Sequence, residues 1–90
     1  MDGYEWDPAK AAANLKKHGV DFADAAVSLE DPAALVAPDP DAGGEERFLC
    51  LAMDPNGRIL VTIYSYVGSK ARIISSRRAS RGERQSYEKR

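Results

Sequence analysis

Three segments in the second half of the chain have the character of β-strands and are separated only by short turns. These segments are residues 47–53, 59–66 and 71–75. The middle segment consists mainly of β-branched and aromatic residues, which favour strands. The turn at residues 54–57 has the sequence DPNG, and residues 67–69 provide a second turn. Because short connections join neighbouring antiparallel strands, the sequence predicts an antiparallel meander, to which the apolar run at residues 33–37 adds a fourth strand.

Two helices are predicted before these strands. Asp7 is a suitable N-cap, Pro8 suits the first helical position, and Gly19 ends the first helix. The second helix begins after Asp21 and stops before Pro32, and its apolar residues recur at the spacing of one helical face.

A third, charged helix is predicted near the C-terminus. Ser80 and Glu83 have the spacing of a capping box, and the helix extends to about Glu88. The predicted fold class is therefore α+β, with two N-terminal helices and one C-terminal helix packed on a curled antiparallel sheet. The length of 90 residues indicates a single domain over residues 1–90.

The composition excludes several classes of protein. Cys50 is the only cysteine, so we expect neither a disulfide framework nor a cysteine metal cluster, as suits the cytoplasm. No apolar run approaches the ~20 residues of a membrane span, and the N-terminus lacks the features of a signal peptide. The acidic residues are dispersed and His18 is the only histidine, so no metal or cofactor site is predicted.

The charge is divided unevenly along the chain. From Lys70 to Arg90 there are eight basic and two acidic residues, whereas residues 1–69 hold five basic and twelve acidic residues. A basic end on an otherwise acidic domain indicates a polyanionic partner, and nucleic acid fits a chain without a membrane signal.

Three arginines near the predicted junction of the last strand and the last helix are candidate phosphate ligands. They are Arg72, Arg77 and Arg78. Arginine binds phosphate oxygens bidentately, and free backbone amides at the start of the helix at Ser80 would also favour an anion. The alternative interpretation is a solvated basic face without a site.

Two other residues are candidates for acid–base chemistry. Histidine is the residue type whose ordinary pKa lies near neutrality, so His18 is a candidate general acid or base, but a histidine also suits the end of a helix through the helix dipole. Glu46, next to Glu45, is a candidate base toward a ribose 2′-OH, or else part of a strand edge with surface ion pairs.

Further residues are candidates for RNA contact. Lys10 and Lys17 lie on the first predicted helix, and Arg81 lies on the last. Each of them either contacts an RNA phosphate or is only part of a charged helix face in contact with water. Trp6 is expected to pack in the core, with stacking on a base as the alternative.

At these positions the sequence resembles the BrnT toxins of type II toxin–antitoxin systems. The resemblance is carried by EWDPAK at residues 5–10, NLKKHGVDF at 14–22, DP at 31–32, GEERF at 44–48, RIISSRRAS at 72–80, ER at 83–84 and YE at 87–88. It implies a RelE-like ribonuclease fold, cleavage of RNA and inhibition of translation. It also implies neutralisation by a BrnA antitoxin, operator DNA bound only through that antitoxin, and a toxin dimer within a heterotetramer.

Carried over residue by residue, the resemblance points to five catalytic candidates. They are His18, Glu46, Arg72, Arg77 and Arg78. It points with less support to Lys10 and Trp6. Three hypotheses remain open: a metal-independent endoribonuclease, a binding module without chemistry, and a degenerate toxin that acts as a co-repressor with its antitoxin.

Overall fold

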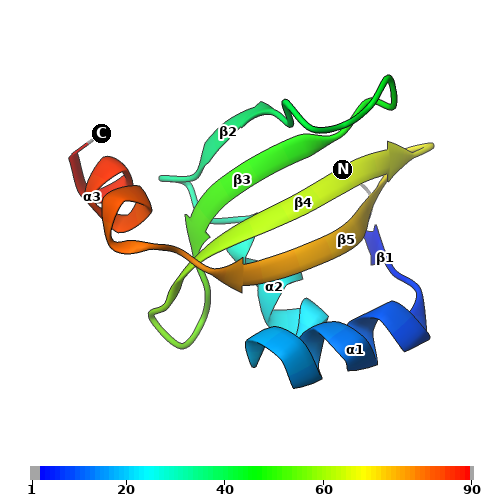
Figure 1. The fold of residues 1–90 in the computed structure, drawn as a ribbon, viewed down its shortest axis with the longest axis horizontal. Coiled ribbons are helices and arrows are strands. Elements are labelled where there is room, and N and C mark those ends of the chain that lie inside the picture. Colours follow the sequence, from blue (N-terminus) through cyan, green and yellow to red (C-terminus); the bar gives the residue numbers. More distant parts are fainter. Residues whose placement is uncertain (1–2, 90) are drawn as a thin grey trace.

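The helices begin and end where the sequence provides capping residues. The computed structural model describes residues 3–89 and contains α1 (Pro8–His18), α2 (Phe22–Ser28) and α3 (Arg81–Lys89) (Figure 1). The Asp7 carboxylate accepts a hydrogen bond of 2.8 Å from the amide of Ala9. Gly19 ends α1 with φ of 70°, a left-handed conformation that suits glycine.

Within residues 3–89, five strands form one open, mixed sheet. The strands are β1 (Tyr4–Glu5), β2 (Leu35–Pro38), β3 (Phe48–Met53), β4 (Ile59–Val67) and β5 (Lys70–Arg78). Their spatial order is β1-β5-β4-β3-β2, and β2 to β5 pair antiparallel with their neighbours. The predicted meander and the α+β fold class are thereby confirmed.

Two details of the sheet differ from the sequence prediction. β1 pairs parallel with β5, with Tyr4 opposite Ala71, so the sheet is not wholly antiparallel. This pairing joins segments that are far apart in the sequence, and no local pattern predicts it. β5 also continues to Arg78 instead of ending at Ser75. Arg77 and Arg78 therefore lie within the strand and not in a linker before α3.

The two faces of the sheet are covered differently (Figure 1). One face packs against α1 and α2 and buries the main apolar cluster. That cluster includes Val20, Phe22, Ala25, Cys50, Leu60, Tyr64 and Ile73. On the opposite face α3 covers only one end of the sheet, where Tyr87 and Ala79 pack with Leu51, Ile59 and Val61. The rest of this second face, which we call the open face, is left accessible.

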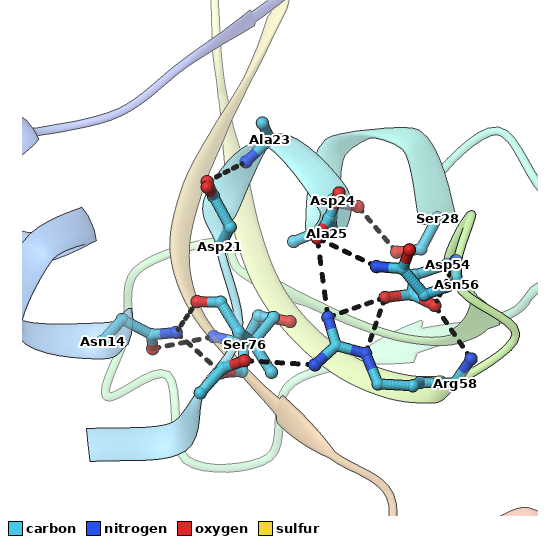
Figure 2. Close-up of polar contacts among 12 residues, drawn as sticks. Asn14, Asp21, Ala23, Asp24, Ala25, Ser28, Asp54, Asn56, Arg58 and Ser76 are labelled. Carbon is cyan, nitrogen blue, oxygen red and sulfur yellow. Dashed lines mark hydrogen bonds and ion pairs between the residues drawn. The ribbon is translucent and has the colours of Figure 1, made fainter. Parts of the chain in front are cut away.

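Polar contacts fix the elements that surround the open face. The Tyr87 hydroxyl donates a hydrogen bond to the Asp31 carboxylate, which also accepts from the amide of Met53 at 2.9 Å. These bonds attach α3 to the end of β3. On the other side, Arg58 binds Asp54 at 2.9 Å and donates to the carbonyl of Gly19 at 3.1 Å (Figure 2). The turn before β4 is thus attached to the end of α1.

None of the helices in the described part of the chain has the length and apolarity needed to cross a membrane.

Candidate active site

A β-bulge in β5 places two of the candidate arginines on the open face. Tyr64 pairs with Ile73 but Ile63 pairs with Ser75, so Ile74 is the extra residue. Since residues five positions apart on a regular strand point to opposite faces, the bulge is what brings Arg72 and Arg77 to the same face. The same register puts Arg78 on the helix-covered face of the strand. The three arginines therefore do not form one cluster.

Arg77 and His18 line a common cavity of about 250 Å³ on the open face. His18 is the last residue of α1, is half-buried, and reaches this cavity from the edge of β5. Ser75 and two carboxylates, Asp39 and Asp41, also line it, together with the apolar side chains of Leu49, Val61 and Ile63. We call the group of His18, Ser75 and Arg77 the Arg77 subsite. It combines an acid–base side chain with a guanidinium, which is the combination that phosphoryl chemistry requires.

Arg77 is held by a carboxylate of the same chain. Its two terminal nitrogens contact the two carboxylate oxygens of Glu83 at 2.8 and 2.9 Å. This bidentate pair lowers the pKa of Glu83 to about 2, with further help from Ser80, and it raises the pKa of Arg77. In this structure the anion that Arg77 binds is therefore Glu83.

The predicted capping box is present and uses two of the amides that were expected to be free. The amide of Ser80 donates to Glu83 Oε1 at 2.7 Å, and the amide of Glu83 donates to Ser80 Oγ at 3.2 Å. A phosphate bound by these amides would have to displace both bonds. The expectation of free donors at this helix start is therefore corrected at Ser80 and Glu83.

Arg72 and Glu46 line a second, larger cavity of about 600 Å³. Lys10 of α1 and Arg47, just before β3, also line this cavity. We call the group of Lys10, Glu46, Arg47 and Arg72 the Arg72 subsite. Arg72 makes one contact of 3.4 Å to Glu5 of β1, so its guanidinium is directed away from Arg77. The structure therefore separates the candidate residues into two subsites.

Comparison with known proteins decides the family of the chain. The family model described as the ribonuclease toxin BrnT of type II toxin–antitoxin systems matches residues 6–83. The chain belongs to the BrnT family. It is also similar to the crystal structure of the Brucella abortus ribonuclease toxin BrnT, with 31% sequence identity and a TM-score of 0.71. That match covers 90% of this chain and 100% of the Brucella chain, whereas a search of curated proteins returned no match.

Three other predicted RNA contacts of this BrnT-family chain lie outside both subsites. Lys17 and Arg81 are exposed on α1 and at the start of α3, and neither lines either cavity. The Trp6 ring packs edge-on against Phe22, with ring centroids 6.1 Å apart. Core packing, the first expectation for Trp6, is what the structure shows.

Asn14 is a residue that sequence reasoning missed, and it fixes the position of α1. Its side-chain amide donates to the carbonyls of Ser76 at 2.8 Å and Val20 at 3.0 Å, and its oxygen accepts from the amide of Ser76 at 3.1 Å (Figure 2). Because His18 follows Asn14 by four residues, the two lie on the same side of the helix. Asn14 thereby fixes the helix that carries His18 to the cavity lined by Arg77. The sequence shows only that Asn14 is a poor helix former in the middle of a helix. Its burial, with 8% of the residue exposed, becomes visible only in the structure.

Within residues 3–89, no group of three or more histidine, cysteine, aspartate or glutamate side chains is arranged to hold a metal ion.

Proposed function

We propose that this BrnT-family chain is a metal-independent endoribonuclease that inhibits translation by cutting RNA. The observation that carries the proposal is the shared cavity of His18 and Arg77 on the open face. The family is described as one of ribonuclease toxins. A face that is left uncovered by the helices, with arginines at two points along β5, is suited to an RNA strand.

The proposed reaction uses the 2′-OH of the substrate as the nucleophile. A base removes the 2′-OH proton, the 2′-oxygen attacks the adjacent phosphorus, and the bond from phosphorus to the 5′-oxygen breaks. The departing 5′-oxygen takes a proton from an acid, leaving a 2′,3′-cyclic phosphate and a 5′-hydroxyl. His18 at the Arg77 subsite and Glu46 at the Arg72 subsite are the acid–base candidates.

Arginine supplies the electrostatic part of this mechanism. Negative charge grows on the phosphoryl oxygens in the transition state, and a fixed guanidinium stabilises that charge more than it stabilises the ground state. Arg77 serves this role after it exchanges Glu83 for the phosphate. Arg72 holds a second point of the RNA, while Arg78, on the other face, takes no part in the reaction.

Cleavage with and without chelator tests the proposal directly. Purified protein should cut single-stranded RNA in EDTA and leave cyclic phosphate ends, and Arg77→Ala should lose at least about a hundredfold in rate, the typical value of one transition-state donor. Lys89→Ala, at an exposed cation on α3, is the control and should cut normally. RNA that stays intact in EDTA but is cut with Mg²⁺ would overturn metal independence.

The proposed partners follow from the family. A type II family implies an antitoxin as partner. We infer a BrnA-type antitoxin, a toxin dimer within a heterotetramer, operator DNA bound only through the antitoxin, and action in the cytoplasm. Co-purification of the two proteins from their shared operon, followed by mass measurement of the complex, tests the composition.

A catalytically inactive toxin that serves as a co-repressor is the alternative. The observation in its favour is the Arg77–Glu83 pair, which occupies the arginine that catalysis needs. Expression of the chain without an antitoxin distinguishes the two functions. Growth arrest supports the ribonuclease, and normal growth with folded protein present supports the co-repressor.

A further inference from the structure

Arg47 carries an unsatisfied donor at the Arg72 subsite. Its Nε atom is buried and lacks a hydrogen-bond partner, the only such side-chain atom found among residues 3–89. A buried polar atom is normally paired. Because the Nε atom itself is closed to solvent, an anion in the cavity would bind the other guanidinium nitrogens of Arg47, whose side chain is 29% exposed. Arg47 forms one long contact of 3.5 Å to Glu45, whose side chain is 68% exposed.

The ion pairs of this subsite are weaker than the pair at Arg77. Arg72 and Arg47 each contact a carboxylate through one nitrogen, at 3.4 and 3.5 Å, while Arg77 binds bidentately below 3 Å. Exposed pairs of this kind contribute little and are screened by salt. Both guanidiniums therefore retain donors for an incoming anion. Lys10 adds a third positive charge to the same cavity, against the two carboxylates of Glu45 and Glu46.

The spacing of the two subsites is set by two elements that lie side by side. α1 runs along β5 (Figure 1), and the bonds of Asn14 to Ser76 hold them together. The eight helical steps from Lys10 to His18 span roughly 12 Å. Four paired positions from Arg72 to Arg77 span roughly 13 Å. The two elements thus place Lys10 with Arg72 and His18 with Arg77, at matching intervals.

From these observations we propose that Arg47 is an RNA-binding residue, which together with Lys10 and Arg72 holds a phosphate distant from the one at the Arg77 subsite. The ligand class is the phosphodiester backbone of single-stranded RNA. The inference rests on the proposed function, because it assigns a second contact point to the same substrate. An RNA substrate must therefore be long enough to reach both the Arg72 subsite and the Arg77 subsite.

Binding of a 2′-O-methyl hexanucleotide, which cannot be cleaved, tests this inference without relying on catalysis. Arg47→Gln should weaken binding roughly tenfold, since a charge-assisted bond is lost. The slope of log affinity against log salt should become shallower by about 0.7, the value for one phosphate contact on a single strand. Glu45→Gln, which frees Arg47, should strengthen binding in the same assay.

The outcomes separate this inference from the proposed function. Wild-type protein that cuts RNA, with Arg47→Gln and Glu45→Gln both binding as wild type does, overturns the subsite and leaves the ribonuclease intact. Wild-type protein that neither binds nor cuts RNA overturns both. If Arg47→Gln does not fold, the Glu45→Gln result decides: tighter binding supports the subsite, and unchanged binding overturns it.

Discussion

The guanidinium of Arg77 and the carboxylate of Glu83 are joined by two parallel contacts of 2.8 and 2.9 Å. A phosphate presents its oxygens to arginine in the same planar arrangement. Glu83 therefore occupies the place that a phosphate would take, and it also holds the amide of Ser80 at 2.7 Å. The pair joins the end of β5 to α3 at a partly exposed position, and under the proposed function it would compete with RNA for Arg77.

The first prediction concerns that competition. Glu83→Gln keeps a side chain that can complete a capping box but removes the negative charge that competes for Arg77. We expect uncleavable RNA to bind several-fold more tightly to Glu83→Gln than to the wild type, as measured by fluorescence anisotropy. Glu88→Gln, an exposed carboxylate on the same helix, controls for net charge. Equal affinities for the two variants would mean that Arg77 is not a phosphate ligand.

The same pair predicts a dependence of stability on pH. Folding lowers the pKa of Glu83 from 4.5 to about 2, so its carboxylate contributes stability above pH 4.5 and loses that contribution as the pH falls toward 2. Because the Arg77 side chain is 46% exposed, we expect Glu83→Gln to cost only about 1 kcal/mol at pH 7. Urea unfolding at pH 7, 5 and 3 should show the difference from wild type shrinking at the lowest pH. A difference in unfolding free energy that stays constant from pH 7 to pH 3 would contradict the lowered pKa of Glu83.

Asn14 gives a prediction about stability and about how α1 is held to β5. Asn14→Ala removes the partners of three backbone groups, two on Ser76 and one on Val20, and should cost about 2–3 kcal/mol. Asn14→Asp retains an acceptor for the amide of Ser76 but loses both donors, and should also be destabilised. Lys16→Ala, exposed on the same helix, should change the urea midpoint little. A mild effect of Asn14→Ala would show that α1 is held to β5 mainly by apolar packing.

Local sequence signals were sufficient for most of the fold. The cap at Asp7, the left-handed Gly19 and the capping box of Ser80 with Glu83 all lie where the sequence placed them, because each depends on neighbours within a few residues. The meander was predictable for the same reason, since its turns are short. The parallel β1–β5 pair was not, because its partners are separated by most of the chain.

The residue types of the candidate site could be proposed from the sequence, but their arrangement could not. Residue types identified Arg72, Arg77 and His18, yet their grouping depends on the extra residue Ile74 and on the packing of α1 along β5. No glycine marks the bulge, and the predicted strand ended before Arg77, so the sequence did not place Arg77 on the same face as Arg72. The competing carboxylate of Glu83 was visible only as a capping residue. Its second role depends on β5 extending far enough to bring Arg77 beside α3.

The last prediction uses Cys50 as a reporter of the core beneath the open face. Its side chain is 1% exposed, and burial, with a smaller contribution from Asp31, raises the pKa of the thiol to about 11. At pH 8 the native protein should therefore react with a thiol reagent only as fast as it opens, and the protein unfolded in urea should react immediately.

The raised pKa of Cys50 also makes the free energy of unfolding depend on pH. Above the pKa of the unfolded thiol, only the unfolded state ionises, so stability should fall as the pH rises from about 9 toward 11. Cys50→Ala, which lacks the titrating group, should show a smaller fall over that range. Immediate labelling of native protein at pH 8 would contradict the burial of Cys50 between the sheet and the two N-terminal helices.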